Sequence, residues 1–140
     1  MRRKLEGTHA AEKNFKTMPG TSYDIDFITG YLLVKHGIRQ KNGAVRDRLW
    51  RCAAAGLLEK KDAARLDHAA ELLRTAEHYV RMVVGRGGKW LPAADHARRV
   101  IANLTGHALD RSFGDDLESE LEATCLEVRG IYDRVLREGS

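Results

Sequence analysis

Apolar residues recur along this chain at steps of three and four, the spacing at which side chains share one face of an α-helix. The longest such pattern covers residues 60–84 and ends at a glycine-rich run, residues 85–88. Its apolar stripe consists of Leu66, Ala69, Leu73, Ala76, Val80 and Val83. Because this is the spacing of a seam between packed helices, the pattern predicts a long helix that is buried along one side.

Four shorter patterns predict helices over residues 22–36, 44–55, 93–104 and about 115–137. Glycines mark the expected ends of the first three, at Gly37, Gly56 and Gly106. In the helix over residues 22–36 apolar residues cover most of the circumference, which predicts a central place in the core. They are Ile25, Phe27, Ile28, Tyr31, Leu32, Leu33 and Val34.

No stretch has the alternating pattern of a strand, so the fold class predicted is all-α. We expect an antiparallel bundle of five to six helices. Of the two tryptophans, Trp50 falls within a helical pattern and is expected to pack in the core. Trp90 lies in a predicted loop between Lys89 and Leu91 and is the better candidate for a surface that meets a partner.

The chain has 140 residues, the size of a single domain with one core. Its net charge of +4 is too small to indicate nucleic-acid binding, so no nucleic-acid partner is expected. No segment reaches the roughly 20 apolar residues of a membrane span, and no signal peptide is visible. Cys52 and Cys125 lie in apolar helical patterns, as buried thiols of a reducing compartment do, which predicts a cytoplasmic protein.

The richest candidate chemistry follows a Pro19-Gly20 turn, where Asp24 and Asp26 fall in the first turn of a predicted helix. Thr21 or Ser22 is expected to cap that helix. Two carboxylates there either complement the helix dipole or form half of a charged site, and local chemistry favours the first. No third acid completes a two-metal centre, so we predict no catalytic residues in this chain.

Two other patterns carry less chemistry. The run Gly85-Arg86-Gly87-Gly88-Lys89 has neither the first glycine nor the final Ser or Thr of a phosphate-binding loop, and it ends a helix instead of opening one. No histidine belongs to a zinc pattern, so no metal site is expected. The histidines are His9, His36, His68, His78, His96 and His107.

Residues 16–28 resemble the Pro-Gly-Gly-x-x-Asp-Ile-Glu-Phe signature of the glutamine synthetase adenylyltransferases, which are related to PII-uridylyltransferase-type nucleotidyltransferases. Thr21 replaces the second glycine, Asp26 replaces the glutamate and Gly30 stands where that family usually has glutamine. Residues 53–58, 72–78, 85–86 and 91–92 are similar to later parts of the same family, in the same order. The resemblance therefore spans nearly the whole chain.

The resemblance implies the helical substrate-binding or regulatory domain of such an enzyme, with residues 1–15 as the helix that joins it to a catalytic domain outside this chain. Mg and ATP would serve that catalytic domain, and no cofactor is expected here. The implied partners are the nucleotidyltransferase catalytic domain, glutamine synthetase and the PII protein. Asp24, Asp26 and Gly20 would contribute to the nucleotide site, and Arg81, Arg86 and Lys89 would form a basic rim.

Two alternatives stay open from the residues themselves. One alternative to this domain is a stand-alone helical module that acts in trans with a separate nucleotidyltransferase subunit, and the other is a purely structural bundle without a ligand.

Overall fold

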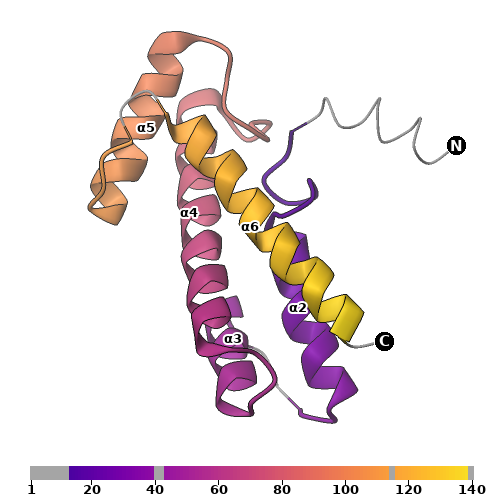
Figure 1. The fold of residues 1–140 in the computed structure, drawn as a ribbon. Helices are drawn as coiled ribbons and strands as arrows, with labels where there is room; N and C mark the ends of the chain where they lie inside the picture. The colour runs from indigo at the N-terminus through magenta and orange to yellow at the C-terminus, as the bar shows by residue number, and fades with distance from the viewer. Residues whose placement is uncertain (1–12, 40–42, 114–115, 139–140) are drawn as a thin grey trace, which may run out of the picture.

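The protein is described by a computed structural model, which covers residues 13–39, 43–113 and 116–138. Throughout these ranges every regular element is a helix (Figure 1). The helices are α2 (Ser22–Lys35), α3 (Val45–Ala54), α4 (Lys60–Val84), α5 (Asp95–Leu109) and α6 (Leu117–Glu138). The predicted all-α class is confirmed, and the predicted bounds of the longest helix agree with those of α4.

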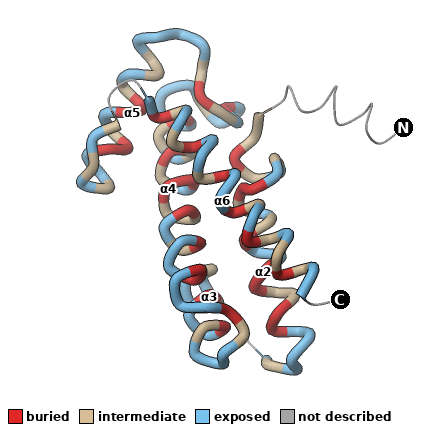
Figure 2. The backbone as a smooth tube through the Cα atoms, in the orientation of Figure 1, coloured by how far each residue is buried: buried red, intermediate tan, exposed pale blue. Residues whose placement is uncertain are grey.

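Helix α4 is the axis of the bundle, because it contacts α2, α3, α5 and α6. Its predicted stripe is buried from Leu66 to Val80, and Leu73 is fully buried. Buried positions recur along the length of α4 in Figure 2. Val83, the last residue of the stripe, is 38% exposed, so the burial of the stripe ends one turn before the helix does. The stripe therefore explains how one long helix holds four others.

The prediction that the helix over residues 22–36 lies centrally in the core is wrong. α2 buries Ile25, Ile28 and Leu32, but Phe27 is 48% exposed and Val34 is 81% exposed. Its helical neighbours are α3, α4 and α6, which leave an outward face uncovered. The apolar circumference of α2 is thus two separate faces, one of which packs in the bundle.

The expectations for the two tryptophans are also wrong. Trp50 is 40% exposed, because its neighbours Leu49 and Cys52 occupy the buried face of α3. Trp90 instead packs against the core, where its ring lies 4.6 Å from the ring of the buried Phe15. A side chain one position along a helix is turned by about 100°, which is enough to move Trp50 from the core to the surface.

Helix α5 passes through Gly106, where we expected it to stop, and ends at Leu109. Asp110 then adopts a left-handed conformation with φ of 55°, and Arg111 N–H bonds back to the Gly106 carbonyl at 2.8 Å. This is a Schellman ending. A Cβ on Gly106 would lie 2.4 Å from the Arg111 oxygen, so the glycine admits the returning chain and does not break the helix.

Residues 1–12, most of the predicted connecting helix over residues 1–15, lie outside the described residues. Residues 13–15 are not helical. From Lys13 to Thr21 the chain forms a tight turn that packs on the bundle, with Phe15 only 1% exposed. Within the described ranges, no helix is long and apolar enough to cross a bilayer.

Candidate functional site

The turn before α2 is held by its own hydrogen bonds. The Asn14 side-chain oxygen accepts from Lys16 N–H at 2.8 Å, and Thr21 N–H donates to the Met18 carbonyl at 3.2 Å. Thr21 occupies the N-cap position, but its hydroxyl also donates to the Met18 carbonyl and does not cap the helix. The threonine therefore closes the turn that precedes α2.

The backbone donors at the start of α2 are already used. Ser22 N–H donates to the Phe15 carbonyl at 3.3 Å, and Tyr23 N–H donates to the Lys16 carbonyl at 3.0 Å. A helix N-terminus binds phosphate through such N–H groups when they are free. Because the preceding segment occupies these donors, any chemistry at this helix start belongs to side chains.

Asp24 ties the start of α2 to α6. One carboxylate oxygen accepts from Gly20 N–H at 2.6 Å and from the Arg129 guanidinium at 3.0 Å. Gly20 has φ of 84°, and a Cβ on it would lie 2.0 Å from the Cys125 carbonyl oxygen on α6. Asp24 and Gly20, both predicted site residues, thus meet in a joint between helices. The Asp24 carboxylate accepts from a backbone N–H that precedes the helix, as a capping side chain does. This agrees with the capping role that the sequence favoured for the acid.

Asp26 lies on a different side of α2, about 200° round the helix from Asp24. Its carboxylate pairs with the Arg48 guanidinium of α3 at 2.7 Å, and its side chain is 53% exposed. Arg48 also donates to the Gly43 carbonyl at 2.8 Å. The two acids therefore bind arginines of different helices and do not share a site. No group of three metal-binding side chains occurs among the described residues.

A cleft of about 410 Å³ opens beside Asp26, between the start of α2, the start of α3 and the middle of α4. Both apolar and charged side chains line it, including the Arg46–Asp67 ion pair at 3.0 Å. The residues lining it are Ser22, Ile25, Asp26, Ala44, Val45, Arg46, Asp67, Ala70, Glu71, Arg74 and Glu77. The repeat of Asp67, Glu71 and Arg74 at helical spacing was the only signal of it in the sequence.

The predicted basic rim falls at the far end of α4. Arg81, Arg86 and Lys89 are all exposed, and Arg81 pairs loosely with Glu77 at 3.7 Å. The Lys89 carbonyl accepts from Phe15 N–H at 3.0 Å, which connects this loop to the turn before α2. Of the three, Lys89 thus lies beside the segment that leads into the candidate site, through its backbone.

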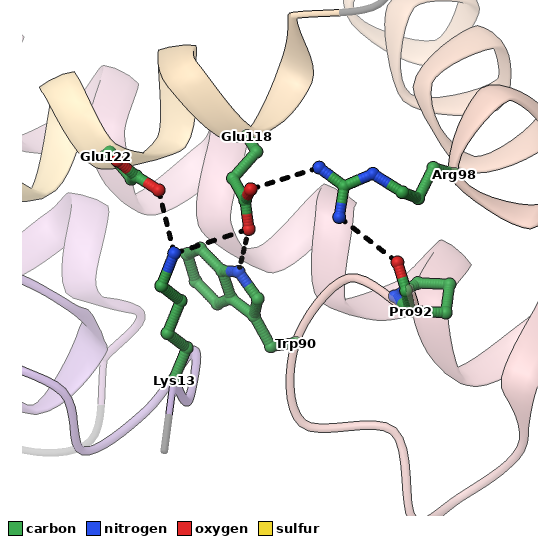
Figure 3. Close-up of polar contacts among 6 residues, drawn as sticks. All are labelled: Lys13, Trp90, Pro92, Arg98, Glu118 and Glu122. Carbon is green, nitrogen blue, oxygen red and sulfur yellow. Dashed lines mark hydrogen bonds and ion pairs between the residues drawn. The ribbon is translucent and has the colours of Figure 1, made fainter. Parts of the chain in front are cut away.

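Glu118, at the start of α6, gathers donors from three parts of the chain (Figure 3). It accepts from the Trp90 indole N–H at 2.8 Å and from the Arg98 guanidinium at 3.1 Å, and it pairs with Lys13 at 3.5 Å. The Trp90 hydrogen bond, followed by Arg98 and Lys13, holds the pKa of Glu118 below its ordinary value against the opposing effect of burial. This cluster was not predicted, because its members are far apart in the sequence.

Comparison of the sequence with known proteins identifies the family of this chain. The sequence model of the family described as GlnD PII-uridylyltransferase matches residues 1–136. The chain belongs to the GlnD PII-uridylyltransferase family. Within that family, the predicted resemblance to glutamine synthetase adenylyltransferases is also confirmed. Two curated relatives are each named "bifunctional glutamine synthetase adenylyltransferase/adenylyl-removing enzyme".

The relative from Streptomyces avermitilis is 29% identical over 127 residues, which cover 89% of this chain and 12% of the relative. The relative from Xanthobacter autotrophicus is 30% identical over 137 residues, which cover 91% of this chain and 13% of the relative. This member of the PII-uridylyltransferase family therefore corresponds to about an eighth of the length of these curated relatives.

Proposed function

We propose that this chain is the helical substrate-binding or regulatory domain of a glutamine synthetase adenylyltransferase-type nucleotidyltransferase. It would act with a catalytic domain that binds Mg and ATP. The observation that carries this proposal is the extent of the match, since about nine-tenths of the chain align with a small part of two such enzymes. A second form of the same role is a separate helical module that acts in trans on the catalytic domain.

The side-chain arrangement supports a binding role over a catalytic one. Asp24 and Asp26 are each neutralised by an arginine, Arg129 or Arg48, and these ion pairs hold α2 against α6 and α3. A carboxylate that catalyses nucleotidyl transfer holds a divalent cation together with other acids. Here the acids fix the turn before α2 and one wall of the cleft beside Asp26, and we propose that this turn and cleft meet the catalytic domain.

A contribution to the nucleotide site would come from Asp26 and the cleft beside it. Asp26 keeps about half of its side chain exposed and borders the cleft, whereas Asp24 is largely covered at 17% exposure. We propose that glutamine synthetase and the PII protein are the partners of the whole enzyme, as the adenylyltransferase resemblance implies. The buried free thiols of Cys52 and Cys125 support a cytoplasmic location.

The experiment tests transfer and association separately. The chain alone, incubated with labelled ATP, magnesium and glutamine synthetase, is expected to leave the target unlabelled. The same chain is expected to bind the separately produced nucleotidyltransferase domain of the Streptomyces relative in a calorimetric titration. Labelling that depends on the chain alone would identify a complete enzyme. Absence of binding to the catalytic domain would contradict the proposed partnership.

A further inference from the structure

Helix α2 carries a second apolar stripe on its outward face. Tyr23, Phe27, Tyr31 and Val34 follow one another at steps of four, four and three, the spacing of one helix face. Tyr23 is 58% exposed, Phe27 is 48% exposed and Val34 is 81% exposed. Exposed apolar side chains that line up on one face indicate an interaction surface, whereas scattered ones do not.

Two rings of this stripe, Phe27 and Tyr31, form a cluster with Tyr132 of α6. Phe27 lies 6.0 Å from the Tyr31 ring and 5.6 Å from the Tyr132 ring of α6. The Arg129 guanidinium lies 4.3 Å from the Tyr132 ring, and Lys35 lies over Tyr31. Packed rings have few alternative conformations, so covering them costs little side-chain entropy.

Gly30 lies in the middle of the stripe. A Cβ added to it would meet no atom within 4 Å, so nothing in the described bundle requires its small size. Glycine inside a helix costs roughly 0.5–1 kcal/mol relative to alanine. Small residues on a helix surface allow another backbone to approach closely, as at packed helix interfaces. The position of Gly30 therefore suits a second helix that crosses α2 at its midpoint.

The charges at the two ends of α2 select the direction of that second helix. Asp24 and Asp26 lie at its start, and Lys35, His36 and Arg39 lie at or just beyond its end. Two α2 helices packed antiparallel would place the acidic end of each opposite the basic end of the other. Their helix dipoles would then point in opposite directions, which is also favourable. A parallel pair would oppose like charges. The surface is therefore complementary to itself.

We propose that a second copy of this chain covers the outward stripe of α2, with the two α2 helices antiparallel about a two-fold axis near Gly30. In this register Tyr23 lies opposite Val34 of the second copy, and Phe27 lies opposite Tyr31. Asp24 lies opposite Lys35 at the edge. A two-fold interface repeats every contact, so one helix supplies both halves of the interface.

The apolar stripe supplies the affinity, and the charges fix the direction. Asp24 and Asp26 already pair with arginines of their own chain, so their attraction for the second copy is weak and falls with added salt. Contact through a helix of 14 residues is small for a protein interface. The expected dimer is therefore weak and forms reversibly as the concentration rises.

Sedimentation equilibrium of the purified chain tests the contact. The chain is expected to pass from monomer to dimer with rising concentration, and Phe27→Arg is expected to raise the dissociation constant at least about tenfold. Leu126→Arg is the matched control, because Leu126 is 76% exposed on α6 and lies outside the stripe. Circular dichroism confirms that both variants stay folded. A wild-type chain that stays monomeric, or equal effects of the two variants, would overturn the proposal.

Cysteine cross-linking tests the direction. In the Gly30→Cys variant, the two introduced cysteines would lie next to each other at the two-fold axis. This variant is therefore expected to form a disulfide-linked dimer. Two copies of Tyr23→Cys would lie about 11 residues, or ~17 Å, apart along the antiparallel helices, so they are not expected to cross-link with each other. Mixed Tyr23→Cys and Val34→Cys chains are expected to cross-link. Self-linking of Tyr23→Cys would indicate parallel packing and overturn the register.

The native thiols give little background in this experiment. Cys52 and Cys125 are both buried, and burial raises the pKa of the Cys125 thiol to about 11. The thiolate is the reactive form, so few native thiols react near neutral pH. Failure of Gly30→Cys to cross-link at concentrations where the unmodified chain is dimeric would show that another face forms the dimer.

Discussion

Replacing Gly20 with alanine separates two roles for this glycine, approach to a nucleotide and approach to α6. The missing side chain is what allows contact in the bundle, because a Cβ would lie 2.0 Å from the Cys125 oxygen and 2.6 Å from its carbonyl carbon. Both atoms belong to the backbone of α6 and cannot rotate away. Gly20→Ala must therefore push the start of α2 away from α6 or distort the turn.

The magnitude follows from two costs. A left-handed conformation costs a residue with a Cβ roughly 1–2 kcal/mol, partly offset by the smaller entropy of the unfolded chain, about 0.4–1 kcal/mol. Overpacking against a fixed backbone adds typically 1–3 kcal/mol. The separation also weakens the bonds of Asp24 to Gly20 and Arg129. We expect Gly20→Ala to lower the free energy of unfolding by about 2–4 kcal/mol.

Gly37→Ala is the matched control. Gly37 also has a positive φ, 66°, but a Cβ on it would meet nothing within 4 Å. Gly37→Ala is therefore expected to lose only the free energy of holding alanine in a left-handed conformation, about 1 kcal/mol. Urea denaturation followed by circular dichroism measures both variants under the same conditions. Equal destabilisation of the two would refute the steric argument and return Gly20 to a role outside the bundle.

Three further predictions concern the core, the acid cluster and the helix start. Leu73→Ala, in the buried seam of α4, is expected to cost about 2–5 kcal/mol in urea denaturation, whereas Arg74→Ala, exposed one position on, is expected to stay within about 0.5 kcal/mol. The stability contributed by Glu118 is present above its ordinary pKa of 4.5 and is lost as the pH falls below it, because folding lowers that pKa. Denaturation midpoints of the wild type are therefore expected to fall more steeply in acid than those of Glu118→Gln. In the full-length enzyme, Asp24→Asn is expected to lower turnover at least about tenfold, or roughly 1.4 kcal/mol, because the amide loses the charge that holds Arg129.

Each of these predictions has an outcome that contradicts it. Similar small effects at positions 73 and 74 would mean that the buried face of α4 is misassigned. If the denaturation midpoints of the wild type and Glu118→Gln change with pH in parallel, folding does not lower the pKa of the Glu118 carboxylate. Unchanged turnover of Asp24→Asn would leave that residue with its local capping role only.

The helices were predictable from sequence because each depends on contacts within a few turns. The stripe through Leu66, Leu73 and Val80 located α4 correctly, since burial of one face needs no knowledge of the partner. The same reasoning was wrong for the helix containing Phe27 and Val34. Apolar residues on an exposed face recur at the same spacing as apolar residues on a buried face. Periodicity alone therefore does not distinguish the two faces of α2.

The candidate site was only partly predictable, because its geometry depends on residues far apart in the chain. The sequence indicated that Asp24 caps the start of a helix, and the bond to Gly20 agrees with this. It could not show that Arg129, 105 positions later, neutralises the same carboxylate. Nor could it place Trp90 against Phe15, since a tryptophan in a loop resembles a surface anchor until the segment that covers it is known.

The position of α6 has a consequence for how the bundle forms during synthesis. The turn before α2 depends on α6 for the contact of Gly20 with Cys125, for the Asp24–Arg129 pair and for the pairs of Lys13 with Glu118 and Glu122. In Figure 1 the early segment and α2 run beside α6, the last helix of the described chain. The contacts among α3, α4 and α5 join neighbours in sequence and are available as soon as those helices leave the ribosome. The contacts of Lys13, Gly20 and Asp24 with α6 must therefore form late, when nearly all the rest of the domain has been made.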